Sequence, residues 1–266
     1  MILYIYMQTN TYLNDCFNQG KLSRWADGVM PLKVYIGKFN WYKSTNAADE
    51  FKYTQMIIDG FNLWEQLSGG LVSFERTMNL YDSNINIDWK RVDRKSLGSC
   101  TFNFDKKGRY YSAELSIGLS DGILHKQYMD ESEVFHTIIH EIGHSVGLGH
   151  SSTKGDIMYV PHEYGVVNIS QNDLATLRWL YKFPVGKTQS EILSMYSKYQ
   201  ATDLDDLVRK MSKTYKSDFE KTKEALEQNM PKKDLLEENQ NIGDLKKYLM
   251  QLNNLQININ RPKKLD

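Results

Sequence analysis

The chain has 266 residues, a length that suits one sizeable domain with an appendage or two small domains. Hydrophobic residues make up 41% of the sequence and aromatic residues 12%, which is enough to bury a core and excludes a disordered or fibrous protein. Lys and Arg together number 33, as do Asp and Glu, so the formal net charge is zero and a nucleic-acid partner is not expected.

Residues 1–27 carry no clear hydrophobic period. Their apolar opening, MILYIYM, is too short for a secretory signal, and no apolar run in the chain approaches the length of a transmembrane segment. The two cysteines, Cys16 and Cys100, are too few for a disulfide-rich scaffold. The sequence neither requires nor excludes a single bridge between them.

The next elements in chain order are a strand, a long helix and two more strands. Residues 32–36, LKVYI, are β-branched and aromatic and favour a strand. Residues 46–68 predict a helix that ends at a Gly-Gly pair. Its apolar face is formed by Tyr53, Met56, Ile57, Gly60, Trp64 and Leu67. Residues 71–74 and 85–89 read as the second and third strands.

Residues 113–119 alternate between apolar and polar side chains, which is typical of a strand at the edge of a sheet. A helix is expected to begin near Asp130, with acidic residues in its first turn where the helix dipole favours them, and to run through His144. Ser170 is the expected N-cap of a further helix. That helix carries Leu174, Leu177 and Leu180.

The composition changes after Pro184, since residues 187–266 contain many charges and one glycine, Gly243. Residues 185–266 predict a helical C-terminal extension that is interrupted at Pro231. Its apolar residues at helical spacing are Leu204, Leu207, Val208, Met211, Leu245, Tyr248, Leu249 and Leu252. Such a face usually packs on the main domain, and the alternative is a module whose helices bind a partner.

The strongest chemical signal is HEIGHSVGLGH at 140–150. His140 and His144 are four residues apart on a predicted helix, so both imidazoles point to one side and can bind one ion. Zinc suits this arrangement, because a catalytic zinc site needs only three protein ligands and neutral imidazole is one of them. Gly147 can adopt a positive φ, end the helix and turn the chain, so that His150 returns as the third ligand. Glu141 is then placed beside the metal without binding it.

The motif HExxHxxGxxH, followed by Met158 in the sequence DIMY, resembles the metzincins, and GLGHSSTKGDIMY resembles their matrixin branch, peptidase family M10. The segment GFNLWEQLSGGLVSFER is similar to the family's first helix and the strand that follows it, and ISQNDLATLRWLY is similar to its last helix. The resemblance covers roughly residues 30–183. It implies an α+β fold with a twisted mixed sheet and three helices, to which this chain adds the helical extension.

The resemblance also implies where a substrate lies. An extended peptide would pair with the edge strand, placed at 113–119, so Ala113 and Leu115 are candidate substrate-binding residues. Tyr159 and Tyr164 follow the Met-turn and either shape the substrate pocket or serve packing. Val160 stands ahead of Pro161 there, which departs from the family's Pro-x-Tyr pattern.

Other departures concern the last helix and the metals. The family often has two adjacent aspartates where this chain has Asn172 and Asp173, of which Asp173 can still support the Met-turn. No second zinc is predicted, and calcium stays a candidate without a clear motif. His136 is expected to be a partly exposed helix residue, and His125 and His162 are expected in loops.

The predicted function is a zinc-dependent metalloendopeptidase that hydrolyses internal peptide bonds of proteins or peptides, with zinc-bound water activated by Glu141. The alternative is a protein-binding module with a vestigial zinc site. The predicted domains are an N-terminal segment at 1–27, a catalytic domain at 28–184 and the extension at 185–266. Cys16 is either a latency ligand in a pro-segment or a free or disulfide-bonded structural cysteine. The resemblance implies an extracellular or cell-envelope location.

Overall fold

The computed structural model describes residues 10–39, 47–93, 96–120, 123 and 130–228. The chain divides into two compact units, Met1–Lys213 and Thr214–Asp266. The helices are α1 (Ala47–Ser68), α2 (Glu131–Ser145), α3 (Gln171–Lys182), α4 (Gln189–Met195) and α5 (Leu204–Gln228), with short 3-10 turns η2 (Leu13–Cys16), η3 (Leu80–Asp82) and η5 (Ser197–Tyr199). Within the described part, no helix is both long enough and apolar enough to cross a membrane.

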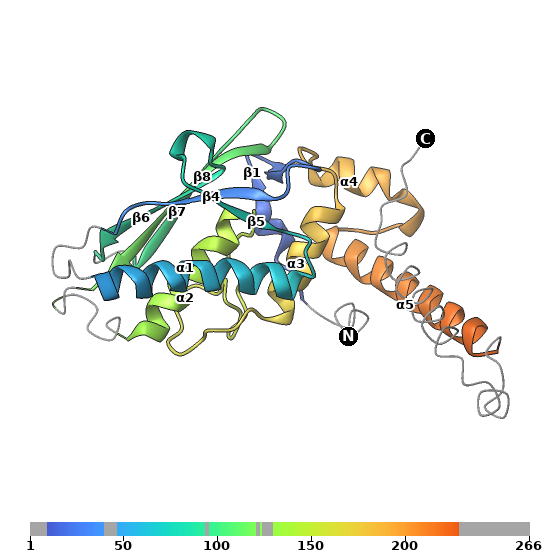
Figure 1. Ribbon diagram of the computed structural model, residues 1–266. Coiled ribbons are helices and arrows are strands. Elements are labelled where there is room, and N and C mark those ends of the chain that lie inside the picture. The colour runs from blue at the N-terminus through green and yellow to red at the C-terminus, as the bar shows by residue number, and fades with distance from the viewer. Residues whose placement is uncertain (1–9, 40–46, 94–95, 121–122, 124–129, 229–266) are drawn as a thin grey trace, which may run out of the picture. The chain divides into compact units, whose positions relative to one another are not determined.

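The first unit is built on a mixed sheet of six strands (Figure 1). These strands are β3 (Arg24–Trp25), β4 (Leu32–Ile36), β5 (Phe74–Thr77), β6 (Ile85–Arg91), β7 (Gly98–Phe104) and β8 (Arg109–Leu119). Strands β5, β4, β6 and β8 run parallel in that order, β3 adds a short parallel pair to β8, and β7 is antiparallel to β8. A separate two-stranded ribbon joins β1 (Phe17–Asn18) to β2 (Lys21–Leu22).

The prediction of an edge strand at 113–119 is wrong. This segment belongs to β8, which pairs with β6 on one side and with β7 on the other. Ala113 and Leu115 are fully buried side chains of the core, so they cannot contact a substrate. Alternation of apolar and polar residues indicates that one face of a strand is buried, but it does not show which strands pair with it on either side. On the side of β8 away from β6, the strand at the edge of the sheet is β7, a segment that the sequence analysis did not assign.

The other elements follow the prediction with one displacement. The strand at 32–36, the helix at 46–68, the strand at 85–89 and the helices starting near Asp130 and Ser170 are confirmed. The strand predicted at 71–74 begins only at Phe74, because two glycines with positive φ precede it and the chain needs residues 71–73 to turn back toward the sheet.

Helices α1 and α2 lie together below the sheet in Figure 1. They approach closely at Gly60 of α1, where a Cβ would stand 2.9 Å from Cγ2 of Ile138 and 3.0 Å from Cδ1 of Ile142. The indole Nε1 of Trp64 donates to the carbonyl of Ile139 at 2.9 Å. The accepting carbonyl lies one residue before His140, so α1 helps to fix the turn of α2 that carries the metal-binding motif.

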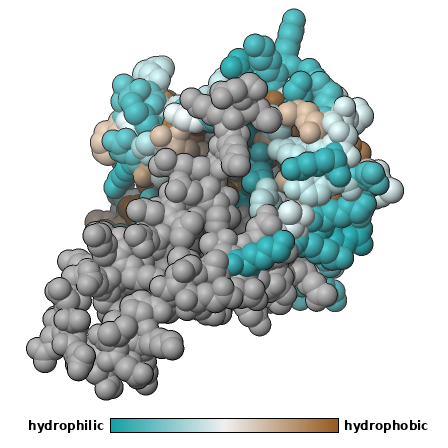
Figure 2. All heavy atoms as spheres, turned by 90° about the vertical axis from the view of Figure 1, so that its right-hand side faces the viewer, coloured by the Kyte–Doolittle hydropathy of each residue, from teal (hydrophilic) through white to brown (hydrophobic). Residues whose placement is uncertain are grey.

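After α3 the chain forms two further helices. Thr188 caps α4 through a capping box with Glu191. The predicted helix after residue 203 is α5, and its first apolar side chains are buried: Leu204, Leu207, Val208 and Met211. The predicted helical stretch around residues 245–252 lies outside the described residues. On the face shown in Figure 2, the described residues are mostly hydrophilic with scattered hydrophobic ones.

Candidate metal centre

Helix α2 places three of the motif's side chains. Asp130 caps it by accepting from the backbone N–H of Ser132, and the helix ends at Ser145. Gly147 then adopts φ +103°, as predicted, and its N–H donates to the carbonyl of His144 at 2.9 Å. A Cβ at Gly147 would meet Leu180 and the backbone of Ser23 at 3.1 Å, so this turn needs a glycine for both its conformation and its space.

The turn brings the three histidines together. One ring nitrogen each from His140, His144 and His150 lies within 4.8 Å of the other two, and the Nε2 atoms of His144 and His150 are 3.2 Å apart. Nδ1 of His140 lies 2.7 Å from the carbonyl of Ile157, and Nδ1 of His144 lies 2.8 Å from the carbonyl of Leu148. A carbonyl can only accept, so both Nδ1 atoms are protonated and both Nε2 atoms keep a free lone pair.

This donor set fits zinc. Zinc–nitrogen bonds of about 2.0–2.1 Å at tetrahedral angles separate two ligand nitrogens by roughly 3.4 Å, close to the observed His144–His150 spacing. Burial is the main cause that lowers the pKa of His140 well below its usual value, and burial lowers the pKa of His144 to about 4. Both imidazoles are therefore neutral, which is the form that binds a metal. The carbonyl partners of their Nδ1 atoms orient the rings.

Glu141 is buried beside this cluster. Its Oε2 has no hydrogen-bond partner among the described residues, an unusual state for a buried carboxyl oxygen. Burial raises the pKa of Glu141 to about 8, against a smaller lowering by Lys90. Gly98, at the start of β7, leaves room for it, since a Cβ there would stand 2.6 Å from Oε1. The edge strand and the carboxyl group are thus in direct apposition.

Met158 packs against α2 with its side chain fully buried. Its carbonyl accepts from the N–H of Ser151 at 2.8 Å, which ties the Met-turn to the residue after His150. Its sulfur packs so closely on Gly143 of α2 that no Cβ would fit there. The expected role of Met158, an apolar floor under the ligands and not a ligand itself, stays a prediction.

Two buried carboxyl groups, those of Asp156 and Asp173, hold the Met-turn in place. Asp173 accepts from the N–H of Ile157 at 2.9 Å, as the sequence analysis expected for support of the Met-turn. Asp156 accepts from the hydroxyls of Ser151 and Ser170 and from the amide of Asn172. Asn172, a departure from the family pattern, therefore serves the same turn by donating to Asp156.

Cys16 lies close to the third ligand but not in the cluster. Its sulfur accepts from the N–H of Gly149 at 3.4 Å and is not among the described groups that could bind the ion with the histidines. Burial raises the pKa of Cys16 to about 12, so the thiol is protonated. Cys16 and Cys100 are both free, so the bridge left open by the sequence is not formed.

A second polar cluster connects α2 with the loop after the Met-turn. His162 Nε2 lies 2.7 Å from Glu133 Oε2, and Glu133 Oε1 accepts from the N–H of Gly165 at 2.8 Å. The ring of His136 packs edge-on against His162, with ring centroids 4.1 Å apart. His136 is buried, so the expectation of partial exposure is wrong. Glu133 and His136 are three residues apart on α2, a spacing that could have indicated a shared partner.

The two candidate tyrosines of the loop differ in exposure. Tyr159 is half-buried and forms an isolated β-bridge with Ser151. Tyr164 is 50% exposed and packs its ring against His162 at 4.7 Å between centroids. His162 lies in a loop, as expected, whereas His125 lies outside the described residues.

The helix with two histidines and a glutamate, the glycine turn, the third histidine and the methionine beneath them define the metzincin class of metal site. The matrixin family model, Peptidase_M10, matches residues 37–182, which is more than half of the chain. The chain belongs to the matrixin family. Among solved structures it is similar to "GM1 bound form of the ECX AB5 holotoxin", with 15% identity, coverage of 72% of this chain and 95% of that chain, and a TM-score of 0.41.

Proposed function

We propose that the protein is a zinc-dependent metalloendopeptidase, with His140, His144 and His150 as zinc ligands and Glu141 as the catalytic base. Membership of a metallopeptidase family supports the class of reaction. The observation that carries the residue assignment is the convergence of three imidazole nitrogens next to Glu141 in the chain, whose buried Oε2 has no hydrogen-bond partner among the described residues. Family membership also favours an extracellular or cell-envelope location.

Zinc bound by the three histidines would supply Lewis-acid chemistry, which acidifies water and polarises a peptide carbonyl. Glu141 would take the proton from the attacking water and return it to the leaving amine. Burial raises the pKa of this carboxyl group, which favours holding the proton taken from water until it is returned to the leaving amine. Burial also excludes bulk water from competing at this oxygen.

Strand β7 is the proposed platform for the substrate. It pairs only with β8 among the described strands, so its other side offers backbone donors and acceptors to an extended peptide. Gly98 begins this strand and lies against Glu141. A protein or peptide segment added along β7 would therefore pass the base. Tyr159 and Tyr164 are proposed to border the substrate from the loop after the Met-turn.

The test is Glu141→Gln, compared with Glu131→Gln, an exposed glutamate in the first turn of the same helix. Zinc content and hydrolysis of casein are measured on the same samples, with and without a chelator. We expect Glu141→Gln to keep its zinc and to lose activity by about 10²- to 10⁴-fold, while Glu131→Gln behaves as wild type. A zinc-loaded wild type that cleaves no protein substrate would favour the alternative, a binding module with a vestigial site.

A further inference from the structure

We propose that Asp15 is a positioning residue of the metal site, which fixes His150 through the backbone from a segment far ahead of the motif. The inference rests on the proposed function, because it concerns the same three ligands. It assigns Asp15, together with its anchor Tyr12, to the support of the metal centre, whereas the sequence alone suggested a segment outside the catalytic domain.

Asp15 contacts the third ligand directly. The backbone N–H of His150 donates to Oδ2 of Asp15 at 2.9 Å. One residue earlier, Gly149 packs against the backbone of Asp15 so closely that no Cβ would fit, and its N–H donates to the sulfur of Cys16. Two consecutive backbone N–H groups, those of Gly149 and His150, therefore donate hydrogen bonds to side chains of the 3-10 turn η2.

His150 depends on this contact more than the other two ligands do. It is the exposed member of the cluster, and it follows a turn that contains two glycines. His140 and His144 each have a carbonyl partner for Nδ1, whereas no partner for Nδ1 of His150 is found among the described residues. The ring of His150 is thus oriented through its backbone, and that backbone is held by Asp15.

The segment that carries Asp15 is itself firmly anchored. Leu13 and Cys16 are buried in the core. The backbone N–H of Tyr12 donates to Oγ1 of Thr176 at 3.2 Å, and its hydroxyl donates to Oδ1 of Asp173 at 2.6 Å. The other oxygen of Asp173 accepts from the N–H of Ile157 in the Met-turn. Asp173 therefore holds both the segment before Asp15 and the Met-turn.

Charge adds to the geometry. The carboxylate of Asp15 is near enough to His144 to interact with it electrostatically. A negative charge behind two ligands favours a bound cation and strengthens the hydrogen bond from His150, because a bond to a carboxylate is roughly twice as strong as one between neutral groups. Asparagine at this position would keep an acceptor oxygen and remove only the charge.

The experiment measures zinc affinity of the full chain by competition with a chromophoric chelator. The variants are Asp15→Ala, Asp15→Asn and the control Asn14→Ala, whose exposed side chain accepts a hydrogen bond from the exposed Gln189 at 3.0 Å. We expect about 10- to 100-fold weaker zinc binding for Asp15→Ala, a smaller but measurable loss of about threefold for Asp15→Asn, and no change for Asn14→Ala. The visible spectrum of the Co²⁺-loaded protein should change in Asp15→Ala, because the geometry of one ligand is released.

A merely structural role for Asp15 would lower the thermal midpoint of the metal-free protein while leaving zinc affinity and the Co²⁺ spectrum unchanged, and that result would overturn the proposal. If metal-free Asp15→Ala does not fold, Asp15→Asn becomes the deciding variant. A wild-type zinc affinity in Asp15→Asn would overturn the proposal equally. Failure of the proposed function is a separate outcome: wild type would bind zinc, respond to Asp15 substitution and still cleave no protein.

Discussion

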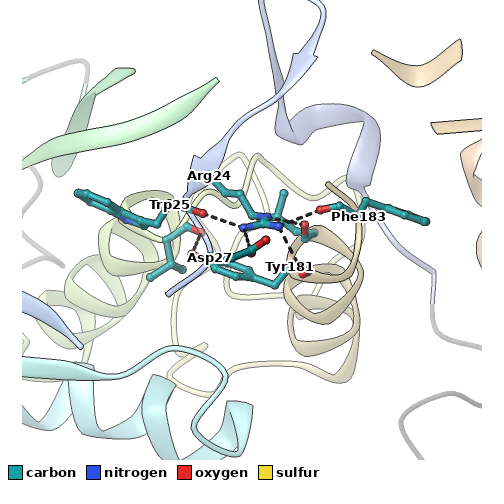
Figure 3. A network of polar contacts seen from close by, with 7 residues as sticks. Arg24, Trp25, Asp27, Tyr181 and Phe183 are labelled. Atoms are coloured by element: carbon teal, nitrogen blue, oxygen red, sulfur yellow. Dashed lines mark hydrogen bonds and ion pairs between the residues drawn. The ribbon is translucent and has the colours of Figure 1, made fainter. Parts of the chain in front are cut away.

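Replacing Arg24 by methionine should destabilise the first unit without touching the metal ligands. Arg24 is a buried arginine in β3, and its guanidinium donates to the carbonyls of Trp25, Leu180 and Phe183 at 2.8–3.0 Å (Figure 3). Leu180 lies in the last turn of α3, where carbonyls have no partner within the helix and the helix dipole favours a cation. The guanidinium also lies over the ring of Tyr181, 4.9 Å from its centroid.

The expected loss of stability follows from the three buried carbonyls that lose their hydrogen-bond donor. Each buried carbonyl that loses its donor costs about 1–3 kcal/mol, so three of them at the lower end give about 3 kcal/mol. Methionine keeps most of the apolar stem, so the cavity contribution is small. We expect a loss of about 3–5 kcal/mol for Arg24→Met, which corresponds to roughly 6–20 °C in thermal midpoint.

Asp27 provides the matched control. It accepts from the same guanidinium at 2.8 Å, but its side chain is 79% exposed, so Asp27→Asn should cost no more than about 1 kcal/mol. Denaturant unfolding followed by tryptophan fluorescence suits the question, because all five tryptophans precede residue 214 and report on the first unit. Equal losses for Arg24→Met and Asp27→Asn would show that the ion pair, and not the carbonyl cluster, carries the stabilisation. A loss below about 1 kcal/mol for Arg24→Met would refute the reasoning altogether.

Two further substitutions test the zinc ligands and the proposed base independently. His150→Ala should lower zinc content after dialysis, because two ligands from one helix hold the ion poorly; full zinc content would show that another group is the third ligand. Gly98→Ala should keep zinc and lower kcat, because its Cβ would stand 2.6 Å from Oε1 of Glu141 and must displace that carboxyl group. Steady-state kinetics with zinc analysis tests the second variant, and an unchanged kcat would contradict the assigned apposition.

The sequence was sufficient for the parts of the site that obey local rules. Spacing of four residues placed His140 and His144 on one face of α2, and the need for a positive φ identified Gly147 as the end of the helix. The caps at Asp130 and Ser170 were visible for the same reason, since a cap depends only on the residues of its own turn. Local periodicity also gave the strand at 32–36 and the first helix.

The parts that depend on contacts between distant segments could not be predicted. The lateral order of the strands is set by pairing across the chain, so β8 was mistaken for the edge and β7 was missed. The burial of His136 comes from His162, 26 residues away, and from the loop around it. The contact of Asp15 with His150 spans 135 residues, and no pattern within either segment indicates it.

The placement of Gly98 links the sheet edge to the chemistry. A side chain there would collide with both Glu141 and Thr137, so β7 can lie against α2 only where a strand residue lacks a Cβ. That contact brings the carboxyl group of Glu141, whose Oε2 has no hydrogen-bond partner among the described residues, to a strand that pairs only with β8 in the described part of the sheet. A peptide that adds to the edge needs an extended backbone, and a folded or helical segment cannot supply the pairing. If the proposed peptidase function holds, we therefore expect the preferred substrates to be unfolded or exposed strand-like segments.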